Sequence, residues 1–70
     1  MGKIKLSNDK TVEMREPKVR DMRIVADEKN EQEKEIKLIS NLTGLTTDEI
    51  DDLSLKDYGL LSGELASFLS

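Results

Sequence analysis

Hydrophobic and polar residues alternate at the start of the chain. Ile4 and Leu6 are separated by a lysine, and Val12 and Met14 are separated by a glutamate. A period of two is typical of strands that bury one face. The four residues between the two runs, Ser-Asn-Asp-Lys, are typical of a turn. The pattern therefore predicts an N-terminal β-hairpin.

The length of the hairpin loop decides which residues face each other. We predict a three-residue loop, residues 8–10, with Lys10 near the left-handed conformation. Directly opposed residues share a face of the sheet, so the predicted pairs are Leu6 with Val12 and Ile4 with Met14. A two-residue Asn-Asp turn would instead set Leu6 against Thr11 and mix the two faces. The three-residue loop is favoured for that reason.

Helical spacing follows the hairpin. Pro17 suits the first turn of a helix, because its missing amide hydrogen has no partner there. Hydrophobic residues continue at helical spacing through about Asp27, namely Val19, Met22 and Ala26 with Val25 beside them. Residues 27–35 contain no hydrophobic residue. They are either a polar linker or an exposed helical turn, and their composition fits both.

The segment 36–70 carries one helix signal after another. A hydrophobic stripe ends at Gly44, where a left-handed residue is expected to close a helix. Thr46 and Glu49 have the spacing of a capping box and predict a short helix. Ser54 predicts the start of a last helix. The two longer stripes are Ile36, Leu38, Ile39 and Leu42, and then Tyr58, Leu61, Leu65, Phe68 and Leu69.

Two glycines interrupt the last predicted helix. Gly59 and Gly63 each cost about 1 kcal/mol relative to Ala inside a helix. Close backbone packing would compensate for that cost, either within the fold or between two chains. We favour packing within the fold.

The chain is expected to form one domain of 70 residues. The predicted fold class is α+β, an N-terminal β-hairpin followed by three to four short α-helices. Its expected parts are the hairpin (1–16), a first helix (17–27), the polar linker or exposed turn (27–35) and a helical unit (36–70). A chain of this size buries only about 60% of its unfolded surface. It also has no Cys, so self-association or a permanent partner is expected to add burial.

Charge is distributed unevenly along the sequence. Residues 1–23 hold seven Lys or Arg against four Asp or Glu, whereas residues 24–70 hold four against eleven. The two parts carry about +3 and −7 and account for the net charge of −4. Such polarity favours head-to-tail assembly or a basic protein partner. Ordinary solvated surface charge is the simpler interpretation, and the sequence leaves both open.

The residue types used in most enzymatic chemistry are missing. The chain has no His and no Cys, and no Ser or Lys lies in a recognisable nucleophile motif. The acids at positions 48–52 lack the ligand spacing of a calcium loop, and acids are expected at the start of a helix. We therefore expect no enzymatic activity, no cofactor and no metal site.

Nucleic acids and membranes are also unfavourable partners. The spacing of a helix-turn-helix runs from Ile39 to Leu53, but its recognition helix would be acidic, and phosphates would repel it. No hydrophobic run exceeds three residues, which argues against a transmembrane span and a signal peptide. We expect a cytoplasmic location. The acids of that helix are Asp48, Glu49, Asp51 and Asp52.

Several short motifs occur in an order that resembles a known family. They are the strand end TVEM at 11–14 with Arg15-Glu16-Pro17, Arg20-Asp21-Met22-Arg23, the run LISNLTGL at 38–45, DEI at 48–50, Leu53, Asp57 and Phe68-Leu69. Together they resemble the small tail assembly chaperones of contractile-tailed bacteriophages, of the Mu-like and P2-like kind. The resemblance covers nearly the whole chain. The hairpin loop departs from it, since a Gly is expected where this chain has Asn-Asp-Lys.

The resemblance implies a non-enzymatic role. Such proteins are thought to bind the tape measure protein and keep it soluble until tail tube subunits polymerise around it. They act in the cytoplasm of the bacterial host and are typically absent from the mature virion. The implied partners are the tape measure protein and, further, the tail tube protein, with self-association of the chaperone itself.

The last helix is the predicted partner-binding element, because its hydrophobic positions cover a wider arc than one core face needs. The candidate residues are Leu60, Leu61, Leu65, Phe68 and Leu69. They would cover the hydrophobic stripe of a partner helix; the other interpretation is that all five lie in the core of the fold or of a dimer. An alternative function is a small acidic phage-encoded regulator or inhibitor that binds a basic protein target through the acids at 48–52.

Overall fold

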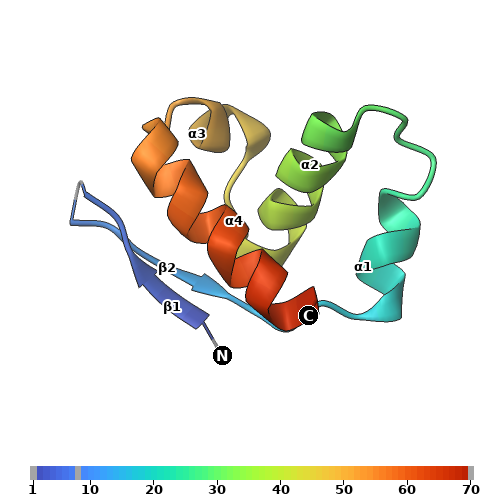
Figure 1. Ribbon diagram of the computed structural model, residues 1–70, viewed down its shortest axis with the longest axis horizontal. Coiled ribbons are helices and arrows are strands. Elements are labelled where there is room, and N and C mark those ends of the chain that lie inside the picture. Colours follow the sequence, from blue (N-terminus) through green and yellow to red (C-terminus); the bar gives the residue numbers. More distant parts are fainter. Residues whose placement is uncertain (1, 8, 70) are drawn as a thin grey trace.

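The computed structural model describes residues 2–7 and 9–69, and Figure 1 shows how their elements are arranged. A two-stranded antiparallel hairpin is followed by four helices within the described residues. This confirms the predicted α+β class. The elements are β1 (Gly2–Lys5), β2 (Thr11–Met14), α1 (Val19–Ile24), α2 (Glu31–Thr43), α3 (Thr47–Asp51) and α4 (Leu55–Leu69).

The hairpin register differs from the predicted one by two residues. Ile4 pairs with Val12, and Gly2 pairs with Met14, so the predicted pairs were wrong. A shift of two keeps every side chain on its predicted face, because side chains alternate with a period of two. Ile4, Val12 and Met14 are accordingly all buried.

The loop closes one residue earlier than predicted. The Leu6 N–H donates to the Lys10 carbonyl oxygen at 2.8 Å, and the Asp9 N–H donates to the Leu6 carbonyl oxygen at 3.1 Å. Asp9, with φ of 66°, is the left-handed residue in place of Lys10. The short polar side chain of Asp tolerates this conformation better than that of Lys. Asn8, part of the predicted loop, lies outside the described residues.

The first helix is shorter than predicted, and its hydrophobic stripe does not form its buried face. It begins at Val19 and ends at Ile24. Val19 and Met22 are exposed, whereas Val25, just beyond the helix, is buried. The buried residue of α1 is Asp21. The helix is therefore oriented by a carboxylate and not by its hydrophobic spacing.

The polar segment divides between a connection and a helix. Residues 28–30 have no regular structure, and α2 begins at Glu31. Asn30 caps α2, because its side-chain oxygen accepts from the Glu33 N–H at 3.0 Å. The Lys37 ammonium also reaches back to Glu28, at 2.5 Å, and ties the connection to the helix. The polar linker is therefore the correct interpretation for residues 28–30, and the exposed helical turn is correct for residues 31–35.

The helix boundaries predicted for the second half are confirmed. Gly44 is left-handed, with φ of 82°, at the end of α2. Thr46 and Glu49 form the capping box at the start of α3. The Ser54 hydroxyl oxygen accepts from the Asp57 N–H at 3.2 Å at the start of α4. Local capping chemistry thus determines these boundaries.

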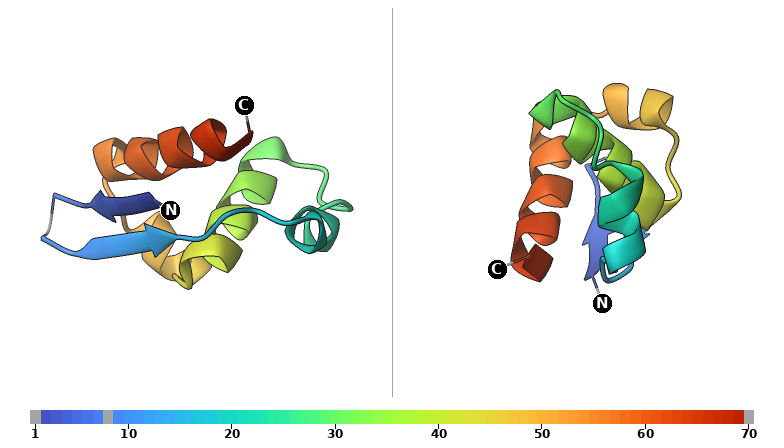
Figure 2. Two further views of the ribbon diagram at one scale, coloured as in Figure 1. Left: turned by 90° about the horizontal axis from the view of Figure 1, so that it is seen from below. Right: turned by 90° about the vertical axis from the view of Figure 1, so that its right-hand side faces the viewer.

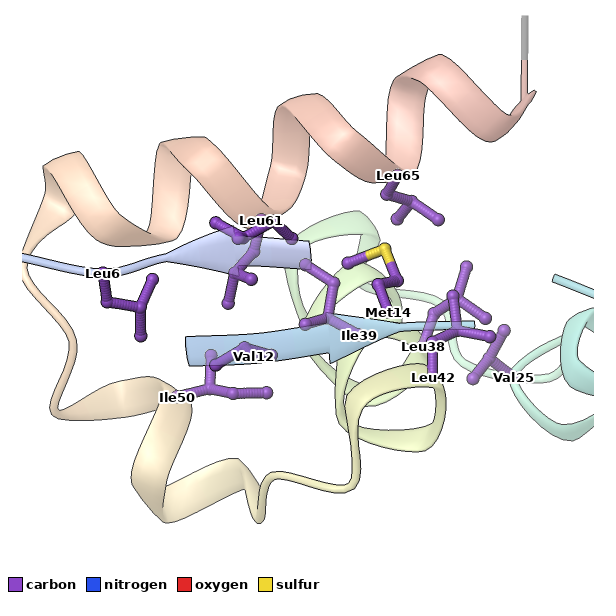
Figure 3. Packing of buried hydrophobic residues seen from close by; sticks show 11 residues of the cluster. Leu6, Val12, Met14, Val25, Leu38, Ile39, Leu42, Ile50, Leu61 and Leu65 are labelled. Carbon is purple, nitrogen blue, oxygen red and sulfur yellow. The ribbon is translucent and has the colours of Figure 1, made fainter. Parts of the chain in front are cut away.

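The core lies where the hairpin, α2 and α4 meet. Figure 2 shows α4 lying along the hairpin, and Figure 3 shows the side chains between them. Met14 of β2, Ile39 of α2 and Leu61 of α4 are fully buried at this junction. The other buried hydrophobic residues are Ile4, Leu6, Val12, Val25, Leu38, Leu42, Ile50 and Leu65.

The outer face of α4 carries the two glycines. A Cβ built at Gly59 or at Gly63 meets no atom within 4 Å among the described residues. The predicted close packing of these glycines within the fold was therefore wrong. None of the helices in the described part of the chain has the length and hydrophobicity needed to cross a membrane.

Candidate functional site

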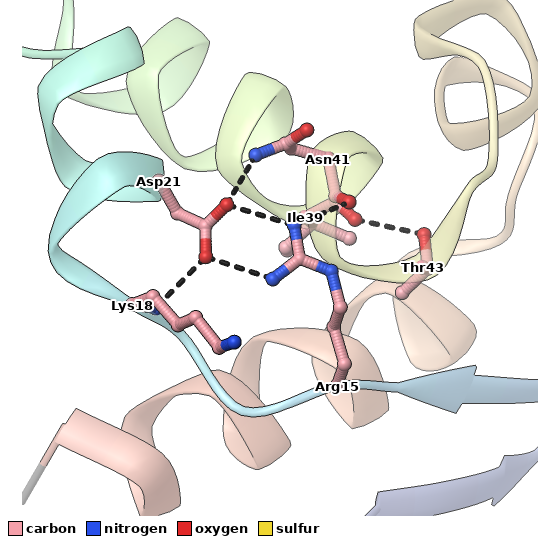
Figure 4. A network of polar contacts seen from close by, with 6 residues as sticks. All are labelled: Arg15, Lys18, Asp21, Ile39, Asn41 and Thr43. Carbon is pink, nitrogen blue, oxygen red and sulfur yellow. Dashed lines mark hydrogen bonds and ion pairs between the residues drawn. The ribbon is translucent and has the colours of Figure 1, made fainter.

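A buried carboxylate joins β2, α1 and α2. The Arg15 guanidinium donates two hydrogen bonds to Asp21, at 2.8 and 2.9 Å, and Asp21 is only 1% exposed. The Lys18 N–H and the Asn41 side-chain amide donate to the same carboxylate at 2.8 and 2.6 Å (Figure 4). The hydrogen bonds from Arg15, and then the Lys18 N–H, lower the pKa of Asp21 to about 2. The ionised carboxylate therefore holds α1 in place.

A second buried carboxylate joins the hairpin loop to α4. Asp57 accepts the Ser7 N–H at 3.0 Å and the Ser7 hydroxyl at 2.8 Å. These hydrogen bonds, above all the one from the Ser7 N–H, lower the pKa of Asp57. Both buried carboxylates are ionised and hydrogen-bonded to protein groups. They act as structural links and not as proton donors.

A shallow hydrophobic groove of about 270 Å³ lies between α1, α2 and the end of α4. Its hydrophobic lining comes from Met22, Leu38, Leu65 and Leu69. Its polar lining comes from the first turns of α2, namely Glu31, Lys34 and Glu35. An apolar cleft with a few charged groups at its edge is the usual form of a binding site for another molecule.

A hydrogen bond joins α2 to α4 at one of the groove residues, Glu35. The Tyr58 hydroxyl donates a short hydrogen bond to Glu35. Burial, and then this hydrogen bond to a carboxylate, raise the pKa of Tyr58. The hydroxyl therefore stays protonated and continues to donate to Glu35, a residue that lines the groove.

The five residues predicted to bind a partner fall into three groups. Leu61 is fully buried in the core, and Phe68 is half-buried against it. Leu65 is buried but also lines the groove, and Leu69 lines the groove with 55% of its surface exposed. Leu60 is 44% exposed. It is nine residues from Leu69, which places it on about the opposite side of the helix.

Two hydrophobic residues of the groove, Met22 and Leu38, were not among the predicted binding residues. Met22 belongs to the helical spacing that predicts the first helix, and Leu38 to the hydrophobic stripe that predicts the second. Both assignments followed helical spacing, and spacing alone gives no signal for a groove formed by three helices. The position of Met22 depends on the burial of Asp21, one residue away.

One acid of the helix α3, Glu49, belongs to the capping box at the start of that helix. The Thr46 N–H donates to Glu49 at 2.9 Å, and this hydrogen bond together with Lys10, 3.5 Å away, lowers the pKa of Glu49. Asp48, Asp51 and Asp52 are exposed. Among the residues that the structure describes, no three potential metal ligands of the types His, Cys, Asp and Glu come together.

The described residues form a hairpin and four helices, with a shallow groove that Met22, Leu38, Leu65 and Leu69 line on its hydrophobic side. The chain belongs to the family described as phage tail assembly chaperone proteins, E, or 41 or 14, whose model matches residues 8–70. This confirms the resemblance found in the sequence. Searches of curated proteins and of solved structures found no match. Membership implies a non-enzymatic role in tail assembly, with protein partners in the tail.

Proposed function

We propose that this protein binds the tape measure protein of its phage and keeps it soluble while the tail tube assembles. Family membership over residues 8–70 is the observation that carries the proposal. The tail tube protein is a further partner in the same process. The chaperone acts in the cytoplasm of the bacterial host and is absent from the mature virion.

The groove between α1, α2 and α4 is the proposed binding surface. A long helix with a hydrophobic stripe aggregates when that stripe meets water. Met22 and Leu69, both exposed, offer such a stripe an apolar surface, and Leu38 and Leu65 lie behind them. This is the helix-in-groove mode of recognition. Leu60 lies on the other side of α4 and takes no part in it.

Co-expression with the tape measure protein tests the proposal. We expect the partner to stay in the soluble fraction and to co-purify with the wild-type chain. Leu69→Glu places a charge in the groove and should return the partner to the pellet, whereas Leu60→Glu is a matched change on the opposite side and should not. Circular dichroism of both variants checks that the fold is intact.

The salt dependence and heat-capacity change of the binding separate the two candidate functions. Binding through an apolar groove should depend weakly on salt and show a negative heat-capacity change. An acidic regulator that binds a basic target through α3 should lose affinity steeply as salt rises. A tape measure protein that remains insoluble beside the wild-type chain would contradict the proposed function.

A further inference from the structure

The side of α1 next to the groove continues outward from Met22. In a helix, residues three and four apart are neighbours on the surface. Val19 is three residues before Met22, and Arg23 is four residues after Val19. At about 100° per residue, these three side chains lie within an arc of about 100°. Val19 is 77% exposed, so a hydrophobic surface extends from the groove over α1 toward Arg23.

The exposed charges of α1 are all positive. Arg20 and Arg23 are exposed and lie three residues apart. The one acid of α1, Asp21, is buried and bound to Arg15. Among the described residues, neither Arg20 nor Arg23 forms an ion pair within 4 Å. The two guanidinium groups are therefore available to carboxylates of another molecule, and we call Val19, Arg20 and Arg23 the α1 rim.

The opposite wall of the groove differs in charge. α2 contributes Glu31, Lys34 and Glu35 to the lining. Two acids and one cation leave this wall with a charge of about −1, whereas the two arginines give the α1 rim about +2. A charged group of a partner therefore meets a different environment on each side of the groove.

A helix seated in the groove meets both walls. With its side chains it is about 10–12 Å across, so its hydrophobic stripe enters the groove while its two flanks lie against α1 and α2. Reversing the direction of such a helix, with its stripe still in the groove, exchanges the two flanks. Acids on one flank lie against the α1 rim in one direction only, and in the other direction they meet Glu31 and Glu35. The charges of the two walls thus favour one direction of the bound chain.

We propose that the α1 rim binds acidic side chains on one flank of the tape measure helix and so sets the direction in which that helix lies. This role rests on the proposed function and specifies the segment that the groove takes. The segment is an amphipathic helix with Asp or Glu, three or four residues apart, along one border of its hydrophobic stripe. Val19 extends the hydrophobic contact, and Arg20 and Arg23 bind the carboxylates. Two cations at the edge add only a modest salt dependence, less than binding through the four acids at 48–52 would give.

Cross-linking of the co-purified complex identifies the groups that the α1 rim contacts. Arg20→Lys combined with Arg23→Lys keeps both charges and adds two amines, which a carbodiimide joins to Asp or Glu at contact distance. The wild-type chain, with Arg at both positions, gives the background. We expect new cross-links from positions 20 and 23 to acids of the tape measure protein that border a hydrophobic stripe. The two linked acids should follow the same order along the partner at every site, because the helix binds in one direction.

Charge reversal measures the contribution of the α1 rim. Arg20→Glu combined with Arg23→Glu places acids against acids and should weaken binding to the tape measure protein at least about tenfold. The control, Lys5→Glu combined with Lys56→Glu, changes net charge equally at exposed positions. The hairpin loop and the start of α4, next to these lysines, lie at the other end of the molecule from α1 (Figures 1 and 2), so the control should bind like the wild type. Competition with a tagged wild-type chain measures binding, and circular dichroism verifies each fold.

Failure of the α1 rim and failure of the proposed function give different results. A soluble complex in which positions 20 and 23 form no cross-link to the tape measure protein, or form them in both orders, would overturn the role of the α1 rim alone. Equal binding by the arginine-to-glutamate variant and the wild type would do the same. A tape measure protein that stays insoluble beside the wild-type chain would contradict the proposed function and the role of the α1 rim with it.

Discussion

The first and last helices are held to the same core in different ways. α4 has 15 residues and buries Leu61 and Leu65 against the hairpin and α2. α1 has six residues and buries Asp21, while Val19 and Ile24 remain exposed. α4 is held by hydrophobic packing together with the hydrogen bonds from Ser7 to Asp57, whereas α1 itself buries only the carboxylate of an ion pair. Hydrophobic spacing identified the buried face only where hydrophobic packing was the dominant force.

The largest expected effect concerns the packing of α4. Leu61→Ala should destabilise the protein by about 2–5 kcal/mol, because it removes buried methyl groups and leaves a cavity. Leu60→Ala, next to it and exposed, should change stability by no more than about 0.5 kcal/mol. Urea unfolding followed by circular dichroism measures both. Equal effects of the two substitutions would show that α4 does not pack as described.

Removal of the ion pair should release α1 and leave α4 in place. Asp21→Asn takes the charge away from Arg15 and weakens the contacts to Lys18 and Asn41. The total cost should be smaller than that of Leu61→Ala, because the Arg15 side chain is 47% exposed and can turn to water. Hydrogen exchange should become faster in α1 and remain unchanged in α4. Faster exchange throughout the chain would contradict the local role of this contact.

Acid should act on the same contact. The pKa of Asp21 is about 2 in the folded chain and 3.8 in its ordinary state, so the unfolded chain binds more protons between these values. Stability from Asp21 is therefore complete above about pH 4 and is lost as the pH falls toward 2. Asp57, whose pKa is also lowered, contributes in the same direction. Melting temperatures measured from pH 5 to pH 2 should fall less steeply in Asp21→Asn than in the wild type.

The smallest expected effect concerns the outer face of α4. Gly63→Ala should stabilise the protein by about 1 kcal/mol, because a Cβ there meets nothing within 4 Å beyond the backbone of its own helix and Ala is the better helix former. Thermal unfolding measures the change. A loss of stability would contradict the open space described around Gly63 and would mean that the glycine packs closely against another group.

The sequence predicted features that depend on neighbouring residues. Gly44, the Thr46–Glu49 capping box and the Ser54 cap were found because each is a local arrangement with its own residue signature. The faces of the hairpin were also predicted. Its register was not, because either Asp9 or Lys10 can close a three-residue loop without moving a residue to the other face.

The candidate site could be predicted only in part. Leu65 and Leu69 were named because they lie in the last hydrophobic stripe, and both line the groove. Met22 was missed because Asp21 fixes the rotation of α1 through Arg15, which lies six residues earlier, and Asn41, which lies twenty residues later. Both partners lie outside α1, so the spacing of residues within that helix could not predict its rotation.

The hydrogen bonds between Ser7 and Asp57 connect residues that are fifty positions apart. During synthesis, the hairpin is made first and α4 last. The part of the core that α4 supplies, with Leu61 and Leu65, cannot cover Ile4 and Leu6 until the end of the chain has been translated. Contacts of such high sequence separation form late because their loop closure costs entropy. The hairpin is thus the first element to be made, and its link to α4 is among the last contacts that can form.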